Sequence, residues 1–295
     1  MNMKISAKAY AKINLLLDVT GVKENGYHRL FTVMQSFGLC DTLTAELTGG
    51  SGIEIVCESP DVPCNEKNIV HKCAVRFFED AGIKAGRGVR FTIEKRIPVF
   101  AGLGGGSADG AAALVLLDKL YGTKLSQRAL CEIGGKVGAD IPFCIVGGTA
   151  LALDTGSIVA PLPDIDDCGI LIIKPSDGVS TKEAYAAVDA CEIRHPASEK
   201  MLDLLLEHKS AEAFKYCDNV FEQAVEIAGR AGLKHTMREN GALAACMSGS
   251  GSAIYGIFKN TAEAQRCADI LTKNYEGVFV ASPVRSGVEI IETAE

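Results

Sequence analysis

The sequence predicts an α+β protein built from two domains, and three observations lead to this prediction. The chain has 295 residues, enough for two domains of ordinary size, and 47% of them are hydrophobic, enough for full cores. Strand-like and helix-like segments are mixed without the regular strand–helix–strand alternation of a parallel sheet. Proline, glycine and aspartate are concentrated in residues 154–169, so we expect one domain at residues 1–157 and another at 158–295.

The first half of the chain contains both strands and helices. Apolar residues alternate with other residues at three places, which is typical of half-buried strands: residues 13–19, 53–57 and 88–95. Helical spacing begins after Asn68, a good N-cap residue, and stops at Gly82.

Two more helices are expected before the domain boundary. One runs from Asp109 to Tyr121 and ends at Gly122, and the other follows Ser126 and ends near Gly138. In the second half, Ser180 and Glu183 fit a capping box at the start of a helix. The remaining expected elements are strands at 170–173 and 278–280, a strand pair around 247–252, and helices at 198–208, 219–230 and 262–273.

A glycine-rich segment lies between the strand at 88–95 and the helix that ends at Tyr121. Four of the five residues 102–106 are glycine, and the segment leads directly into an alanine- and leucine-rich helix. Glycine lets a ligand approach the main chain closely, and unpaired amides at a helix start favour phosphate. The segment therefore indicates a phosphate-binding loop, although a flexible turn is the alternative.

The two common nucleotide-binding loops do not fit this segment or any other. A Walker A loop needs G-x-x-x-x-G-K-[ST], but Gly135-Lys136 is followed by Val137. A dinucleotide fingerprint needs a third glycine where this chain has Ser107 or Asp109.

Composition and charge exclude several classes of protein. The formal charge of −7 argues against a nucleic-acid binder, and the 11 cysteines form no C-x-x-C pair, which is typical of reduced thiols. The longest uncharged stretch, residues 141–153, is shorter than a membrane span. We therefore expect a cytoplasmic protein that binds neither membrane nor nucleic acid, as a monomer or a weak homodimer.

Four further segments carry polar residues whose local pattern leaves their role open. Lys12 and Asn14 share one face of a strand, which is either a solvated face or part of a site. Tyr27 and His28 follow a glycine turn and are either loop residues or a binding pair. Asp140 precedes an apolar stretch and is either a base or a helix cap. The loop at residues 248–252 is either a plain turn or a close approach to a ligand.

Together, in this order, these segments resemble the GHMP kinases. The motifs are A-K-I-N-L, G-Y-H, P-x-x-A-G-L-G-G-G-S, G-A-D-I-P and M-S-G-S-G, and the resemblance extends from Ala9 to about Ile290. It implies the two-domain GHMP kinase fold, with an N-terminal domain like domain 2 of ribosomal protein S5 and a ferredoxin-like C-terminal domain. It also implies ATP-dependent phosphorylation, with Mg²⁺, of the 2-hydroxyl of CDP-methylerythritol in the non-mevalonate (MEP) isoprenoid pathway.

The resemblance also implies a role for each matching residue. Asp140 would take the proton of the acceptor hydroxyl and Lys12 would be its catalytic partner. Ser107 is the one candidate ligand for Mg²⁺. The nucleotide would be held by Lys95, Pro98, Gly102, Leu103, Gly104, Gly105, Gly106, Ser107 and Ala108. The acceptor would be bound by Asn14, Tyr27, His28, Asp140, Tyr185, Gly249, Ser250 and Gly251.

The chain departs from the family pattern after the glycines. Ala108 stands where a second serine is common, which puts a second hydroxyl at the metal in doubt, and Gly110 stands where alanine is usual. Two alternative functions remain at this point. One is another GHMP kinase, acting on mevalonate, homoserine or a sugar, and the other is a non-catalytic relative that only binds a ligand.

Overall fold

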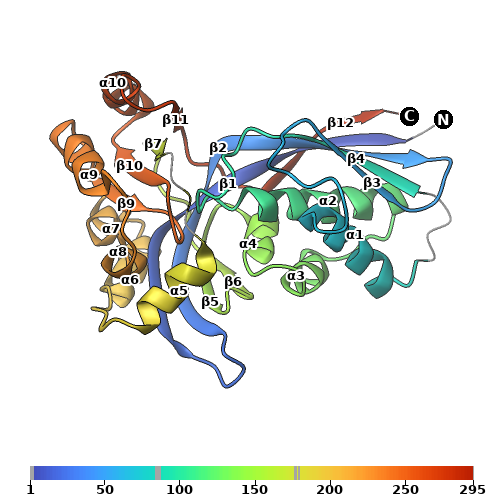
Figure 1. Cartoon of the computed structure of the whole chain (residues 1–295), viewed down its shortest axis with the longest axis horizontal. Coiled ribbons are helices and arrows are strands. Elements are labelled where there is room, and N and C mark those ends of the chain that lie inside the picture. The colour runs from blue at the N-terminus through green and yellow to red at the C-terminus, as the bar shows by residue number, and fades with distance from the viewer. Residues whose placement is uncertain (1–2, 84–87, 176–177, 179, 295) are drawn as a thin grey trace.

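The structure, a computed structural model, describes residues 3–83, 88–175, 178 and 180–294. Two long antiparallel strands, β1 (Lys4–Val22) and β2 (His28–Thr48), run through much of the molecule (Figure 1). The first sheet has the order β12-β1-β2-β4-β3. Its other strands are β3 (Ile53–Cys57), β4 (Gly88–Glu94), β5 (Thr149–Asp154), β6 (Ile158–Pro161), β8 (Asp218–Asn219) and β12 (Val288–Ala294).

Four helices accompany this sheet: α1 (Ile69–Asp80), α2 (Gly105–Tyr121), α3 (Gln127–Gly135) and α4 (Ile141–Val146). Helix α2 packs on β1 and β2 and is covered by the other three. Its residues from Ala108 to Leu114 are all buried, as expected for a helix that is apolar on every side. Ala7, Ala9 and Ala11 of β1 are also buried. The small side chains on β1 and α2 allow the strand and the helix to pack closely.

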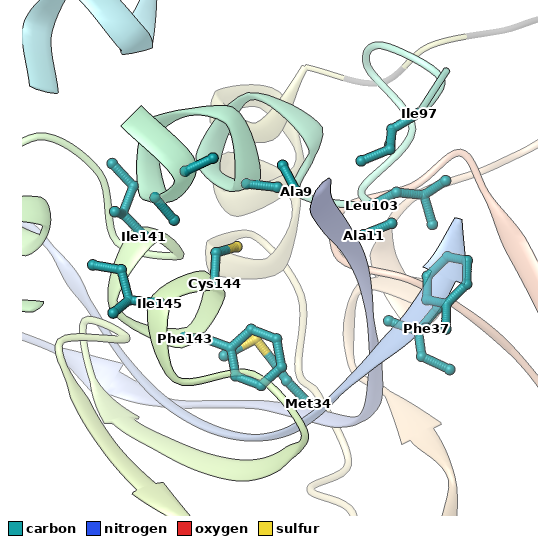
Figure 2. Packing of buried hydrophobic residues seen from close by; sticks show 14 of the residues in the cluster. Ala9, Ala11, Met34, Phe37, Ile97, Leu103, Ile141, Phe143, Cys144 and Ile145 are labelled. Carbon is teal, nitrogen blue, oxygen red and sulfur yellow. The ribbon is translucent and has the colours of Figure 1, made fainter. Parts of the chain in front are cut away.

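The N-terminal core extends to the glycine-rich segment. Figure 2 shows Ala9 and Ala11 of β1, Phe37 of β2 and the α4 residues Ile141 and Phe143 within one packed cluster. Ile97, which precedes the glycine-rich segment, and Leu103, which lies within it, belong to the same cluster and are each 1% exposed. These anchors fix the loop on the core from both sides.

The second sheet has the strand order β11-β7-β10-β9. Its strands are β7 (Gly169–Lys174), β9 (Ala244–Met247), β10 (Ile254–Phe258) and β11 (Gly277–Ala281). In chain order this is 4-1-3-2, the arrangement of a ferredoxin-like split βαβ unit, as expected. The helices of this half are α5 (Thr181–Asp189), α6 (Ser198–Leu206), α7 (Ser210–Ala213), α8 (Phe221–Ala224), α9 (Arg230–Glu239) and α10 (Thr261–Leu271), with a 3₁₀ turn at Phe214–Tyr216.

The two halves of the molecule are joined by strand pairing as well as by the covalent connection between them. The short strand β8 pairs in parallel with β1 through Leu16 and Leu17, and β12 pairs with β1 along Lys4–Ala9. The first sheet therefore contains residues from beyond position 158. The division into domains at 157 and 158 stays a prediction.

The α+β class and most elements are confirmed, and the capping residues account for several of the helix starts. The side chains of Asn68, Ser126 and Ser180 each accept a backbone N–H at the start of the expected helix. Gly122 ends α2 in the left-handed conformation, with φ of +62°. Within the described residues, no helix is both long and apolar enough to cross a membrane.

Two expectations about elements were wrong, and several elements, among them strand β2, were not expected. Helix α2 begins at Gly105 rather than Asp109. The expected helix at 219–230 is only α8, because Val225 and Ile227 leave the helix to enter the C-terminal core and Gly229 starts α9 instead. Strand β2 was not expected, because Gln35 and Ser36 are buried beside Met34 and Phe37, which removes the alternation of a half-buried strand.

Candidate active site

The glycine-rich segment presents unpaired amides at the start of α2. Gly104 is the N-cap of the helix, with φ of +71°, and the first helical hydrogen bond runs from the amide of Ala108 to the carbonyl of Gly104. The amides of residues 104–107 precede that bond and have no partner within the helix. The predicted phosphate-binding loop thus has the backbone geometry that an anion requires.

Two of the glycines are required by close approaches of other segments. A Cβ on Gly102 would lie 2.1 Å from the carbonyl oxygen of Ser248, and one on Gly104 would lie 2.9 Å from Cγ of Lys12. Both residues also have positive φ, at +75° and +71°. The glycines therefore bring the loop against β1 on one side and against the 248–252 loop on the other.

Lys12 and Asp140 meet beside Gly104. The Nζ of Lys12 lies 3.3 Å from Oδ2 of Asp140 and donates to Oδ1 of Asn14 at 2.8 Å. The Lys12 side chain is 4% exposed, whereas that of Asp140 is 37% exposed. Asp140 precedes α4 but makes no side-chain capping bond, so its carboxylate remains available at the surface of the site.

Strand β1 directs Lys12 to this position. The pairing of β1 with β2 changes register between Tyr10 and Ala11 and again between Asn14 and Leu16, and such irregularities re-aim side chains. The amide of Lys12 also donates to the carbonyl of Leu103 at 3.0 Å, which ties the strand to the loop. The buried positions of Lys12 and Asn14 exclude a solvated polar face.

Asn14 is the centre of a buried hydrogen-bond network. Its Oδ1 accepts from Lys12 and from the amide of Gly249, and its Nδ2 donates to Thr32. The hydroxyl of Ser248 donates to the carbonyl of Gly102 at 2.9 Å. The loop at 248–252 therefore holds the glycine loop and β1 together rather than forming a plain turn.

Two clefts meet at the glycine loop, where both are lined by Gly102 and Gly104. The wide cleft, about 630 Å³, is lined by residues of both halves of the chain. It contains most of the expected acceptor residues: Asn14, Tyr27, His28, Asp140, Tyr185, Gly249 and Ser250. It also contains Lys12, expected as the catalytic partner, and Ser107, which was expected on the nucleotide side. The narrow cleft, about 390 Å³, contains the expected nucleotide residues Lys95, Pro98, Leu103, Gly105 and Gly106.

Two expected residues lie outside both clefts. Ala108 is fully buried and its amide is already used by the helix, so it offers no donor to a ligand. Its methyl group points into the core, so a serine there would not reach the clefts. Gly251 packs on the sulfur of Met247, 2.9 Å from where its Cβ would be.

Gly110, the other departure from the family pattern, also has a packing reason. A Cβ at this position would lie 2.8 Å from Cγ2 of Ile69 and 3.0 Å from Sγ of Cys73. Helix α1 therefore packs closer to α2 than an alanine would allow.

A buried ion cluster under the loop was not anticipated. The Nζ of Lys95 lies 2.5 Å from Asp41 and 2.7 Å from Asp109, and the three side chains are 7%, 0% and 5% exposed. Asp41 also accepts from the amides of Arg96 and Ile97. The sequence held one signal for this cluster, since a carboxylate in an otherwise apolar buried helix needs a partner.

The cluster makes the stability of the protein depend on pH. Burial raises the pKa of Asp109 from 3.8 to about 8. The charge of Lys95 lowers this pKa and the charge of Asp41 raises it further. Between these values the folded chain holds a proton that the unfolded chain releases, so the free energy of unfolding falls as pH rises through that window. We expect urea unfolding to show this fall between about pH 5 and pH 8, above the range in which ordinary carboxylates titrate, and Asp109→Asn to reduce it.

Asp80→Asn is the matched control for this measurement. Hydrogen bonding to Lys136 lowers the pKa of Asp80 below 3.8, so its contribution to stability is constant across the same window. An unchanged slope in Asp109→Asn would contradict the assignment of the pH dependence to Asp109.

The fold and the site together define a class of protein. A helix start with free amides, placed between two clefts and facing a carboxylate–lysine pair, suits the transfer of a phosphoryl group to a small molecule. This arrangement is the one expected of a kinase of small molecules, and comparison with known proteins gives the family.

Family models for the GHMP kinases N terminal domain and the GHMP kinases C terminal match residues 68–148 and 221–277. A 4-diphosphocytidyl-2-C-methyl-D-erythritol kinase of Clostridium perfringens is 39% identical over 286 residues, covering 95% of this chain and 98% of the relative. The kinase of that name from Clostridium novyi is 39% identical over 283 residues, covering 94% of this chain and 99% of the relative.

A crystal structure of 4-(cytidine 5'-diphospho)-2C-methyl-D-erythritol kinase has a TM-score of 0.76 at 30% identity, covering 94% of this chain and 98% of that one. A homoserine kinase from Cytophaga hutchinsonii has a TM-score of 0.77 at 22% identity, covering 98% and 97%, and shows the fold alone. The chain belongs to the GHMP kinase family, within the group of 4-diphosphocytidyl-2-C-methyl-D-erythritol kinases. The expected two-domain fold and kinase activity are thereby confirmed.

Proposed function

We propose that this chain transfers the γ-phosphoryl group of ATP to the 2-hydroxyl of 4-diphosphocytidyl-2-C-methyl-D-erythritol. The observation that carries the proposal is the meeting of two clefts at Gly104, with Lys12 and Asp140 in the wall of the wide cleft. The names and near-complete coverage of the relatives support this acceptor.

The donor nucleotide fits the narrow cleft. Its lining combines apolar residues, Val62, Pro63, Ile69 and Val99, with the glycines of the loop. A planar base suits the apolar residues, and the phosphates suit the free amides at the helix start. The γ-phosphoryl group would cross at Gly104 into the wide cleft.

The acceptor hydroxyl would lie beside Asp140. A carboxylate within hydrogen-bond reach of the hydroxyl can take its proton as the oxygen attacks phosphorus. Lys12, held by Asn14, keeps a positive charge beside that carboxylate and beside the oxygen that loses its proton. The backbone amides of the loop stabilise the charge on the transferred group.

The aromatic part of the wide cleft suits a pyrimidine base. Tyr27, His28 and Tyr185 supply aromatic rings there, and the rings of His28 and Tyr185 are stacked with centroids 4.3 Å apart. Tyr27 is 65% exposed and free to cover a bound base.

Magnesium would be held mainly by the nucleotide. Within the described part of the chain, no three His, Cys, Asp or Glu side chains gather to form a metal site. The hydroxyl of Ser107, at the helix start and in the wide cleft, is the side chain placed to contribute a ligand, which fits an ion that binds phosphates and water. Such an ion would neutralise phosphate charge.

A coupled assay of ADP formation with and without 4-diphosphocytidyl-2-C-methyl-D-erythritol tests the proposal. We expect ADP release that depends on this acceptor and is absent with mevalonate, homoserine or galactose. Turnover with one of those three instead would assign another member of the family. Binding of ATP without turnover on any acceptor would indicate a ligand-binding relative.

Replacing His28 by alanine is expected to raise KM for the cytidylyl acceptor about 5- to 100-fold, the usual effect of one lost hydrogen bond to a buried polar group. KM for ATP should not change, because His28 lies in the wide cleft and not in the narrow one. Steady-state kinetics with each substrate varied in turn measure both constants. His235→Ala, on the exposed face of α9, is the control, and a rise in KM for ATP alone would contradict the placement.

A further inference from the structure

His28 has a partner that the proposed chemistry does not use. Its Nε2 lies 2.8 Å from Oδ1 of Asp189, the last residue of α5. The His28 side chain is 12% exposed, and its ring is stacked on Tyr185 of the same helix at an interplanar angle of 20°. Figure 1 shows α5 beside the lower part of the β1–β2 hairpin, where β2 begins. Two contacts from one helix therefore fix the plane and the rotation of the imidazole.

The contact with Asp189 determines which ring nitrogen carries the proton. An ionised carboxylate only accepts hydrogen bonds, so Nε2 must be the protonated nitrogen. In the neutral ring, Nδ1 is then a hydrogen-bond acceptor. The hydrogen bond made by one ring nitrogen of a histidine commonly fixes the tautomer in this way. Among the described residues, no hydrogen bond to Nδ1 is formed.

An acceptor nitrogen distinguishes pyrimidine bases. Cytosine carries an exocyclic amino group that donates, whereas uracil carries a carbonyl oxygen at the same position that accepts. Nδ1 can accept a hydrogen bond from the amino group of cytosine. With uracil, the lone pair of Nδ1 would face a lone pair of the carbonyl oxygen. A polar group of the site that bonds the correct base is left unpaired when the wrong base is bound, and this lowers the reactivity of the wrong substrate.

We propose that Asp189 is a positioning residue that holds His28 in the Nε2-protonated form and thereby makes the acceptor site select cytidylyl over uridylyl substrates. The inference rests on the proposed function. It adds a specificity role for a residue that is itself 49% exposed at its side chain and outside the wide cleft.

The test compares kcat/KM for 4-diphosphocytidyl-2-C-methyl-D-erythritol and its uridylyl analogue at about pH 8, where an ordinary imidazole is neutral. We expect Asp189→Ala to lower the cytidylyl-to-uridylyl ratio about tenfold or more, with KM for ATP unchanged. Glu183→Gln, an exposed acidic residue on the same helix, is the matched control. A ratio within twofold of the wild-type value in Asp189→Ala would overturn the inference.

A double-mutant cycle and a spectrum separate this role from a general effect on α5. If Asp189 acts through His28, its replacement in a His28→Ala background should leave the ratio unchanged. Nitrogen-15 shifts of the His28 ring should show the proton on Nε2 in the wild type and a mixture of both forms in Asp189→Ala. A proton on Nδ1 in the wild type would also overturn the inference.

Failure of the inference and failure of the proposed function give different results. A wild-type enzyme that does not phosphorylate the cytidylyl acceptor contradicts the function, and the ring spectrum then still decides the tautomer. An active wild-type enzyme whose base preference does not depend on Asp189 contradicts the inference alone.

Discussion

Asp140→Asn is expected to lower kcat by about 10²–10⁴-fold, the usual contribution of a general base. The asparagine keeps the shape of the side chain beside Lys12 but cannot take the proton of the acceptor hydroxyl. KM for ATP should change little, because Asp140 lies in the wide cleft and the nucleotide would bind in the narrow one. Acceptor-dependent ADP formation at saturating substrates measures the loss.

The control for this prediction is Asp269→Asn. Asp269 is an exposed residue of α10 that pairs with Gln265, so its replacement should leave kcat at the wild-type value. Near-normal turnover by Asp140→Asn would remove Asp140 from the chemical step. A large rise in KM for ATP would instead place the residue on the nucleotide side of the loop.

Lys95→Met is expected to reduce the free energy of unfolding by about 3–5 kcal/mol, the usual result of removing one partner from a buried ion pair. The substitution leaves the carboxylates of Asp41 and Asp109, both buried, without their shared cation. Urea unfolding followed by circular dichroism measures the change. Adding Asp109→Asn to Lys95→Met should recover part of the loss at about pH 9, above the pKa of Asp109, because folding then no longer has to bury or protonate a second carboxylate.

Lys136→Met is the matched control, since Lys136 pairs with Asp80 but is 51% exposed at its side chain. Exposed pairs contribute about 0–1 kcal/mol, so this variant should unfold almost like the wild type. An equal effect of the two methionine substitutions would show that burial of the Lys95 cluster has no energetic consequence.

Local signals in the sequence predicted much of the fold. The caps at Asn68, Ser126 and Ser180 and the glycine at position 122 each act within one helix turn, so the sequence contains all that is needed to place them. Strand β12 was missed because its seven residues are stabilised by pairing with β1, almost the whole chain away. The helix expected at 219–230 failed for a similar reason, since packing in the C-terminal core overrides its helical spacing.

The site was predicted in part from the residues and in part from resemblance. The glycine loop is a local feature, and its composition alone indicated phosphate binding, with a flexible turn as the alternative. From the local sequence, Lys12 was consistent with a solvated strand face and Asp140 with a helix cap. Only the fold brings Nζ of Lys12 within 3.3 Å of Oδ2 of Asp140. The Asp41–Lys95–Asp109 cluster and the Asp189 contact join residues that are distant in sequence. The isolated carboxylate of Asp109 in an apolar helix was the one signal, and it indicated a partner without identifying it.

The pairing of β12 with β1 has a consequence for the synthesis of the protein. The strand that carries Lys12 leaves the ribosome long before its partner, so one of its edges along Lys4–Ala9 stays open until residues 288–294 have emerged. Contacts of such sequence separation form late. A nascent chain therefore exposes a bare sheet edge while the residues between the two strands are made, and a chaperone that covers β-edges would find its binding site there until β12 has emerged.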